Sequence, residues 1–190
     1  MIILRSESDF FTSVYKALEE IDPDFEKYTG LLCVGSHFPA QIQEKIENIR
    51  RAREENVPFL GICFGMQLAA IEYARNVLGI VDATSEELAE GGTHVIKKMP
   101  ELRVGVRLVC WDGSCRMESH WHNYNFNKDF ERFYKDNWEM AFMDGVLEVM
   151  KLKNHPFFVG IQFHPEYQSS RKMPHPLLKE FIKACRKSAL

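Results

Sequence analysis

The sequence predicts an α/β fold in which an open, mostly parallel sheet carries helices on both faces. Short apolar runs of strand length alternate along the chain with amphipathic helical patterns, as in proteins built from strand and helix units. Several runs are apolar at consecutive positions, and Phe157–Phe163 is one example. Parallel strands need such runs because helices cover both of their faces and keep water away.

The individual elements follow from these two patterns. Strands are expected where short apolar runs occur, near Ile2–Leu4, Gly30–Val34, Phe59–Cys63, Arg103–Val109, Met140–Asp144, Val146–Leu152 and Phe157–Phe163. Helices are expected where apolar residues recur at helical spacing, near Phe10–Ile21, Ile42–Glu55, Met66–Leu78 and Pro176–Lys187. The stretch Asn123–Asn137 is aromatic and charged without a clear period, so we expect it to form a surface excursion.

Composition narrows the class of protein. At 190 residues and 45% hydrophobic content, the chain suits one compact domain over residues 1–190. The net charge of -3, with basic and acidic residues mixed, argues against a nucleic-acid partner. No apolar run is long enough for a membrane span, and Met1–Leu4 is too short for a signal peptide core. Five cysteines form no C-x-x-C pair and leave one unpaired in any disulfide scheme, which favours a reducing cytoplasm.

The most informative motif is Gly61-Ile62-Cys63-Phe64-Gly65, where an apolar run meets the start of a helical pattern. A side chain exposed on a sharp strand-to-helix turn needs very small neighbours two residues away on either side. The dipole of the following helix favours a thiolate, and the Phe64 N–H is placed to face an oxyanion. The motif therefore predicts a nucleophile at Cys63, although an isolated motif of this kind also fits a buried structural cysteine.

A second segment supplies partners for that cysteine. The strand pattern Phe157–Phe163 ends in His164-Pro165-Glu166, and residues two apart on an extended segment face the same way. A nucleophilic cysteine needs a histidine to take its proton, and the histidine needs a carboxylate to hold its tautomer. We therefore predict a Cys63–His164–Glu166 triad. The alternative is a loop histidine beside a solvated glutamate.

At these residues the chain resembles a known family, the class I glutamine amidotransferases, and within it the glutaminase domain of CTP synthase. The likeness is strongest in Pro58–Gln67 and continues through Ile71–Val77, with further landmarks at Gly91-Gly92-Thr93 and Phe163–Tyr167. The resemblance implies the flavodoxin-like fold of that family. Only Asp22–Thr29 stands where the family carries an additional strand, so we expect one edge strand to be missing.

The resemblance also implies roles for individual residues. It makes Cys63 the nucleophile, His164 the general base and Glu166 its partner in an amide hydrolysis that releases ammonia through a thioester. Gly35 and Phe64 would provide the oxyanion hole. Gln67 and Glu87 would contact the substrate, Glu87 through an α-amino group. Read from the sequence alone, Gln67 is an ordinary helix residue and Glu87 fits a solvated helix start.

The chain departs from the family at two places. Ser36 and Phe38 stand where the oxyanion strand has glycines, which reduces backbone freedom there. Ser119, Trp121 and Asn123 stand where the resemblance implies an arginine-rich stretch, from which one arginine grips the substrate's α-carboxylate. Loss of one charge-assisted contact costs about 1.5–3 kcal/mol. We therefore expect Trp121 and Asn123 to face either weakly bound glutamine or another amide, unless Arg116 reaches in as a substitute.

Three functions stay open at this stage. The chain is a self-sufficient hydrolase of glutamine or a γ-glutamyl amide, a glutaminase that passes ammonia to a separate synthase, or a non-catalytic descendant that binds a ligand or partner. No P-loop pattern occurs, so no nucleotide cofactor is expected. The pair His120 and His122 suggests a metal, but the sequence shows no complete ligand set beside it, and we expect no metal.

Overall fold

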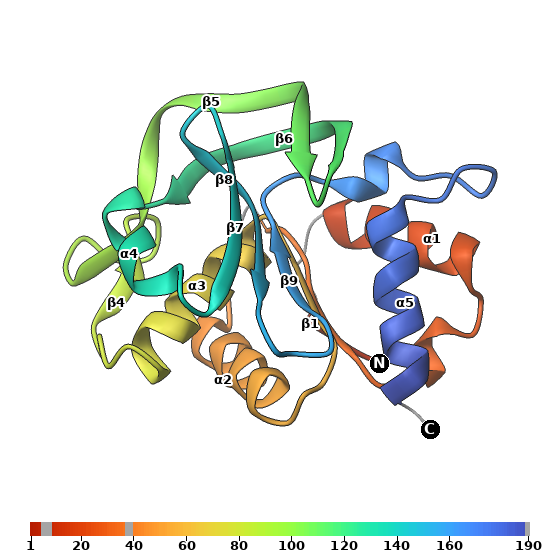
Figure 1. Ribbon diagram of the computed structural model, residues 1–190, viewed down its shortest axis with the longest axis horizontal. Coiled ribbons are helices and arrows are strands. Elements are labelled where there is room, and N and C mark those ends of the chain that lie inside the picture. Colours follow the sequence, from red (N-terminus) through yellow and green to blue (C-terminus); the bar gives the residue numbers. More distant parts are fainter. Residues whose placement is uncertain (5–8, 37–39, 189–190) are drawn as a thin grey trace.

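The computed structural model describes residues 1–4, 9–36 and 40–188, and its main element is a six-stranded sheet (Figure 1). The strand order is β1–β2–β3–β9–β8–β7. Four neighbouring strands are parallel, namely β1 (Ile2–Leu4), β2 (Leu31–Cys33), β3 (Phe59–Ile62) and β9 (Phe158–Ile161). The remaining two, β8 (Val146–Leu152) and β7 (Trp138–Met143), are antiparallel. The predicted open, mostly parallel sheet is confirmed.

Helices cover both faces of this sheet (Figure 1). Alternate residues of each strand face opposite ways, so Leu31 packs with α2 (Ile42–Glu54) and α3 (Phe64–Asn76), whereas Leu32 packs with α1 (Asp9–Ile21) and α5 (Pro176–Ser188). The result is one apolar core on each face. Burial on both sides explains why the strand sequences are continuously apolar.

The segment between α1 and β2 contains no strand. Its residues 22–30 are all described, and they form one 3₁₀ turn, η1 (Phe25–Lys27), whose Phe25 is buried against α1 and α5. The sheet therefore ends at β1, as expected from the short stretch Asp22–Thr29.

A second sheet was only partly predicted. It consists of β4 (Ala83–Ser85), β5 (Thr93–Trp111) and β6 (Ser114–Phe126), and β5 and β6 form a long hairpin. The sequence indicated only Arg103–Val109. The rest of the hairpin escaped notice because its buried face is polar: Glu118, His120 and His122 are nearly inaccessible, so the usual apolar alternation is absent.

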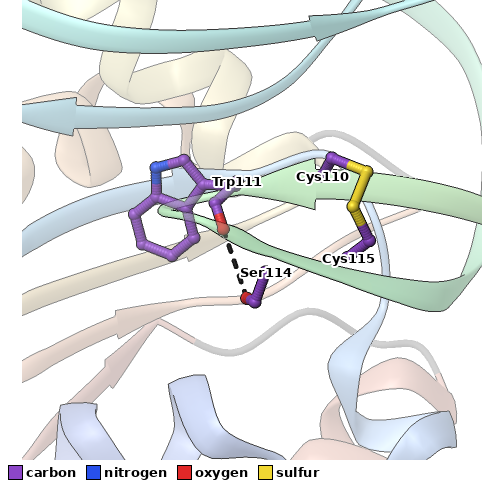
Figure 2. Close-up of a disulfide and its surroundings, with 4 residues drawn as sticks. All are labelled: Cys110, Trp111, Ser114 and Cys115. Atoms are coloured by element: carbon purple, nitrogen blue, oxygen red, sulfur yellow. Dashed lines mark hydrogen bonds between the residues drawn. A yellow bond between two sulfur atoms is a disulfide. The ribbon is translucent and has the colours of Figure 1, made fainter.

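The hairpin ends in a disulfide between Cys110 and Cys115, which face each other across the two strands (Figure 2). Beside it the Ser114 hydroxyl donates a hydrogen bond to the Trp111 carbonyl, 3.2 Å away. This pairing was not expected from the spacing. The other cysteines, Cys33, Cys63 and Cys185, are free and buried.

The expectation of a surface excursion over Asn123–Asn137 is wrong. The segment completes β6 and then forms η2 (Lys128–Phe130) and α4 (Glu131–Tyr134). Phe126 and Tyr134 are buried, and the Tyr134 hydroxyl donates to the Ala70 carbonyl of α3 at 2.6 Å. Because the pieces are short, the aromatic residues that anchor them have no regular period.

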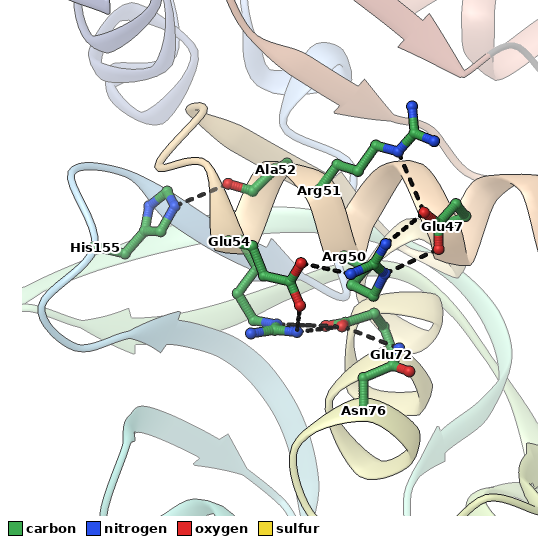
Figure 3. A network of polar contacts seen from close by, with 9 residues as sticks. Glu47, Arg50, Arg51, Ala52, Glu54, Glu72, Asn76 and His155 are labelled. Carbon is green, nitrogen blue, oxygen red and sulfur yellow. Dashed lines mark hydrogen bonds and ion pairs between the residues drawn. The ribbon is translucent and has the colours of Figure 1, made fainter.

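An ion pair ties the helix after Cys63 to its neighbour (Figure 3). Arg53 of α2 donates to both carboxylate oxygens of Glu72 of α3, at 2.8–3.1 Å, and Glu72 is fully buried. The Arg50 pairs with Glu47 and Glu54 lie at the surface, where such pairs add little stability. The charged face of Ile42–Glu54 is therefore solvated in part only.

Among the described residues, no helix combines the length and apolar character needed to cross a bilayer.

Candidate active site

Cys63 occupies a strained turn between β3 and α3. Its φ of 53° and ψ of -106° are unusual for a residue with a side chain. The flanking glycines make the turn possible: a Cβ on Gly65 would lie 2.0 Å from the Cys33 carbonyl oxygen, and one on Gly61 would lie 2.7 Å from the Gly65 carbonyl carbon. The predicted elbow geometry is therefore present, and strain at a cysteine is typical of a functional position.

The histidine and the glutamate meet as predicted. His164 follows β9, which lies next to β3 in the sheet, and Glu166 lies in η3 (Pro165–Gln168). His164 Nδ1 donates to Glu166 Oε1 at 2.8 Å, and both side chains are buried. The backbone N–H of His164 donates to the Ser119 carbonyl at 2.8 Å, and the Phe10 ring stacks on the imidazole with centroids 4.5 Å apart. These contacts fix the orientation of the ring.

The sulfur and the imidazole share one environment. A Cβ on Gly35 would lie 3.2 Å from His164 Cε1 and 3.4 Å from Cys63 Cβ, so Gly35 packs against both residues. His164 Nε2 is buried and makes no hydrogen bond to any described residue, which leaves it for the thiol. Burial opposes the charged imidazolium, but attraction to Cys63 and Glu166 outweighs it and raises the pKa of His164 to about 10. An imidazolium of this kind favours an adjacent thiolate.

One residue at the site was missed from the sequence. Gln162 Nε2 donates to Cys63 Sγ at 3.5 Å, and Gln162 Oε1 accepts from Gln67 Nε2 at 3.3 Å. Gln67 Nε2 also donates to the Tyr124 carbonyl. This atom is therefore the nitrogen of the Gln67 amide, so Gln162 presents its oxygen to Gln67 and its nitrogen to Cys63. The available signal was position, because Gln162 precedes His164 by two residues and therefore faces the same way.

A pocket of about 160 Å³ opens beside the sulfur. It brings together every residue that was predicted to bind substrate, with others from β5 and β6. Its lining consists of Ser36, Cys63, Phe64, Gln67, Glu87, Leu102, Trp121, His122, Asn123 and Tyr124. Gly35 borders Cys63 without lining the pocket, and Phe38 lies outside the described residues.

The described lining of the pocket contains no strong cation, because none of its residues is a lysine or an arginine. Burial lowers the pKa of His122 to about 4, so this ring is neutral near pH 7. Burial also raises the pKa of Glu87, the one acidic residue of the lining. A substrate carboxylate would find no charged partner here, whereas an amino group would find Glu87.

Arg116 does not line the pocket beside Cys63. It lines a different cavity, together with Glu118 and His175. Ser119 faces η3, where its hydroxyl accepts from Gln168 at 2.9 Å. The departures at Ser119, Trp121 and Asn123 are therefore not compensated by Arg116.

The two histidines of β6 serve a polar network. His120 Nδ1 lies 3.0 Å from the Glu118 carbonyl, and its Nε2 lies 2.8 Å from Glu148, which also binds Arg103 at 2.9 Å. Both ring nitrogens of His120 are thus engaged by protein oxygens. Within the described ranges, no group of three or more histidine, cysteine, aspartate or glutamate side chains could hold a metal ion.

Comparisons with known proteins identify the family of this chain. A family model for glutamine amidotransferase class-I matches residues 4–184. The chain is 38% identical to the CTP synthase of Flavobacterium psychrophilum, over 90% of this chain and 37% of that protein. It is 40% identical to the CTP synthase of Nitratidesulfovibrio vulgaris, over 85% of this chain and 36% of that protein.

A solved structure shows the same fold. The glutaminase domain of the Trypanosoma brucei CTPS, with bound acivicin, superimposes with a TM-score of 0.83 at 25% identity, covering 95% of this chain and 89% of that one. Fold and site thus define an α/β protein with a cysteine on a nucleophile elbow beside a histidine–glutamate pair. The chain belongs to the class I glutamine amidotransferase family. It spans little more than a third of the length of the CTP synthases it resembles.

Proposed function

We propose that residues 1–190 act as one amidotransferase domain that hydrolyses a carboxamide and releases ammonia. The observation that carries this proposal is the joint placement of Cys63, His164 and Glu166. The cysteine lies on a strained elbow at the wall of a pocket, and the histidine pairs with a buried glutamate on the neighbouring strand end. Positive φ at a cysteine is costly, and the fold retains it where the thiol faces the pocket.

The reaction follows from this arrangement. The Cys63 sulfur attacks the carboxamide carbon while His164 holds the thiol proton. The oxyanion forms against the Phe64 N–H, with Gly35 as the second donor, and collapses to a thioester as His164 gives its proton to the departing ammonia. Water then attacks the thioester with His164 as base, which yields a carboxylate and restores the thiol. Glu166 stabilises the imidazolium throughout.

The pocket supports a substrate whose head group is not a free carboxylate. A carboxylate entering a site without a guanidinium or ammonium partner loses strong hydration and gains only neutral donors. Trp121 is half exposed at the pocket wall and offers a flat apolar surface, while Glu87 suits an amino group. We propose an amide that lacks a free α-carboxylate, such as a γ-glutamyl compound modified at that group, as the preferred substrate, with glutamine as a weaker one.

A second function is favoured by a separate observation. The outer face of the β5–β6 hairpin exposes a row of large apolar side chains, Leu102, Val104, Val106, Leu108, Met117 and Trp121. Val104 lies opposite Trp121, and Leu108 lies opposite Met117, so the row includes residues of both strands, with Ser119 between Met117 and Trp121 on β6. Because Leu102 and Trp121 also line the pocket, a partner on this face would seal its mouth. A synthase subunit that accepts ammonia is such a partner.

Release of ammonia and amine from a panel of substrates separates these functions. The panel contains glutamine, asparagine, glutamine amidated at its α-carboxylate and γ-glutamyl amides. Turnover faster with the carboxylate-free amides, and absent in Cys63→Ala, supports the self-sufficient hydrolase. Fast turnover of glutamine alone, or only on addition of a synthase, supports the second function. Unchanged turnover in Cys63→Ala would refute the mechanism.

A further inference from the structure

A second cavity, of about 210 Å³, lies between the tip of the β5–β6 hairpin and the start of α5. Its base is apolar and includes Val109, Val149, Phe163 and Leu177, all of which are buried. Trp111, beside the Cys110–Cys115 disulfide, forms part of its wall (Figure 2). The volume suits a small organic molecule. The proposed amide hydrolysis does not use this cavity.

A buried carboxylate faces this cavity with half of its hydrogen-bonding capacity unused. Glu118 lines the cavity and is 2% exposed. Its Oε1 accepts from His175 Nε2 at 2.9 Å, whereas its Oε2 is inaccessible and makes no hydrogen bond with any described residue. A buried carboxyl group with an unpartnered oxygen is costly, so a cation placed against it is stabilised.

His175 holds one oxygen of that carboxylate and is itself positioned by the backbone. Its Nδ1 accepts the backbone N–H of Leu177 at 3.2 Å, and its Nε2 lies 2.9 Å from Glu118 Oε1. Asp112 and Glu180 add two further carboxylates to the lining, against the single guanidinium of Arg116. The cavity consequently has an excess of negative charge.

The lining also indicates what kind of cation fits. No set of three or more metal-ligating side chains occurs in the part of the chain that the structure describes, which disfavours a metal ion. The apolar base and the Trp111 wall suit a hydrocarbon or aromatic body. We propose that this cavity is a binding site for a small organic ammonium ion, held by the negative charge of the Glu118 carboxylate with its apolar part on Trp111.

The cavity lies near the predicted triad. Phe163 lines the cavity and directly precedes His164, and Glu118 directly precedes Ser119, whose carbonyl accepts from the His164 N–H.

The proposal is tested by titrating the full chain with 2-phenylethylammonium. Binding is followed by calorimetry and by the NMR resonances of the tryptophan indole groups. The neutral 2-phenylethanol and the anionic phenylacetate serve as matched probes. We expect the ammonium to bind, the two other probes to bind at least ~10-fold more weakly, and the Trp111 indole to shift. Equal affinity for the neutral probe, or no binding of the ammonium at millimolar concentration, would overturn the proposal.

Variants locate the site. Glu118→Gln should weaken ammonium binding by about 10- to 100-fold, the loss expected for one charge-assisted contact. Arg116→Gln removes a competing cation from an exposed position and should tighten binding about twofold. Glu118→Gln also alters the buried pair of Glu118 with His175. Trp111→Ala, which leaves that pair in place, should weaken binding independently. Glu87→Gln is the matched control in the Cys63 pocket, and loss of binding in that variant instead would place the ligand there and refute the proposal.

Discussion

The strand-end site and the β5–β6 hairpin differ in how their functional residues are held. Around Cys63 the backbone itself sets the geometry, since Gly65 lies so close to the Cys33 carbonyl that no side chain fits. On the hairpin, Trp121 is half exposed and Gly105 has no heavy atom near the position of a Cβ. The predicted reacting groups are thus held by close backbone contacts. The hairpin residues lie where a larger side chain would meet few neighbouring atoms.

The largest effects are expected from the reacting groups. Replacing Cys63 or His164 by alanine should each lower kcat/KM by about 10³-fold or more, and the double variant should be no worse, because the two act as a unit. Glu166→Gln should cost less, since it keeps a hydrogen bond to Nδ1 and loses only the charge. Additive losses in the double variant would show that the two residues do not work together.

A steric comparison comes next in size. Gly65→Ala places a Cβ 2.0 Å from a carbonyl oxygen, so we expect a loss of about 3 kcal/mol or more in the free energy of unfolding. The new Cβ of Gly105→Ala on the hairpin meets no neighbour, so only the φ of 94° opposes it. We expect this variant to lose about 1–2 kcal/mol in the free energy of unfolding. Urea denaturation of both variants checks the difference, and similar losses would contradict it.

The hairpin should respond to a gain of charge. Trp121→Arg restores a cation at the pocket wall and should improve the apparent affinity for glutamine by about 10- to 100-fold. Asn123→Arg is the neighbouring test, and an exposed arginine at Val106, outside the pocket, is the control. Equal gains from Val106→Arg would mean that general charge, not a pocket contact, is responsible.

A pH dependence of stability is also expected. The folded-state pKa of His164 is about 10, above the ordinary value of 6.5. Protonation of His164 therefore stabilises the fold fully below pH 6.5, and this contribution is lost as pH rises through about 10. The difference in unfolding free energy between the native chain and His164→Gln should narrow over that interval. A difference that is constant with pH would contradict the raised pKa.

The sequence predicted the strand-end region well and the hairpin poorly, for physical reasons. Parallel strands that are buried on both faces are apolar at every position, so they can be recognised in the sequence. The glycines around Cys63 can also be recognised, because only glycine permits the close contact at those positions. The hairpin buries Glu118 and His120 against partners distant in sequence, and its outer face is the apolar one, which reverses the usual pattern. Gln162 was visible only through its spacing from His164.

Alkylation of the three free cysteines by iodoacetamide, mapped by mass spectrometry across pH, tests the activated nucleophile most directly. Burial raises the pKa of both Cys33 and Cys185 to about 12, so neither should react near pH 7. We predict that Cys63 reacts at pH 7 and far faster than the other two, and that His164→Ala slows it at least tenfold. A Cys63 that reacts no faster than Cys33 or Cys185, or that is indifferent to His164→Ala, would contradict the account.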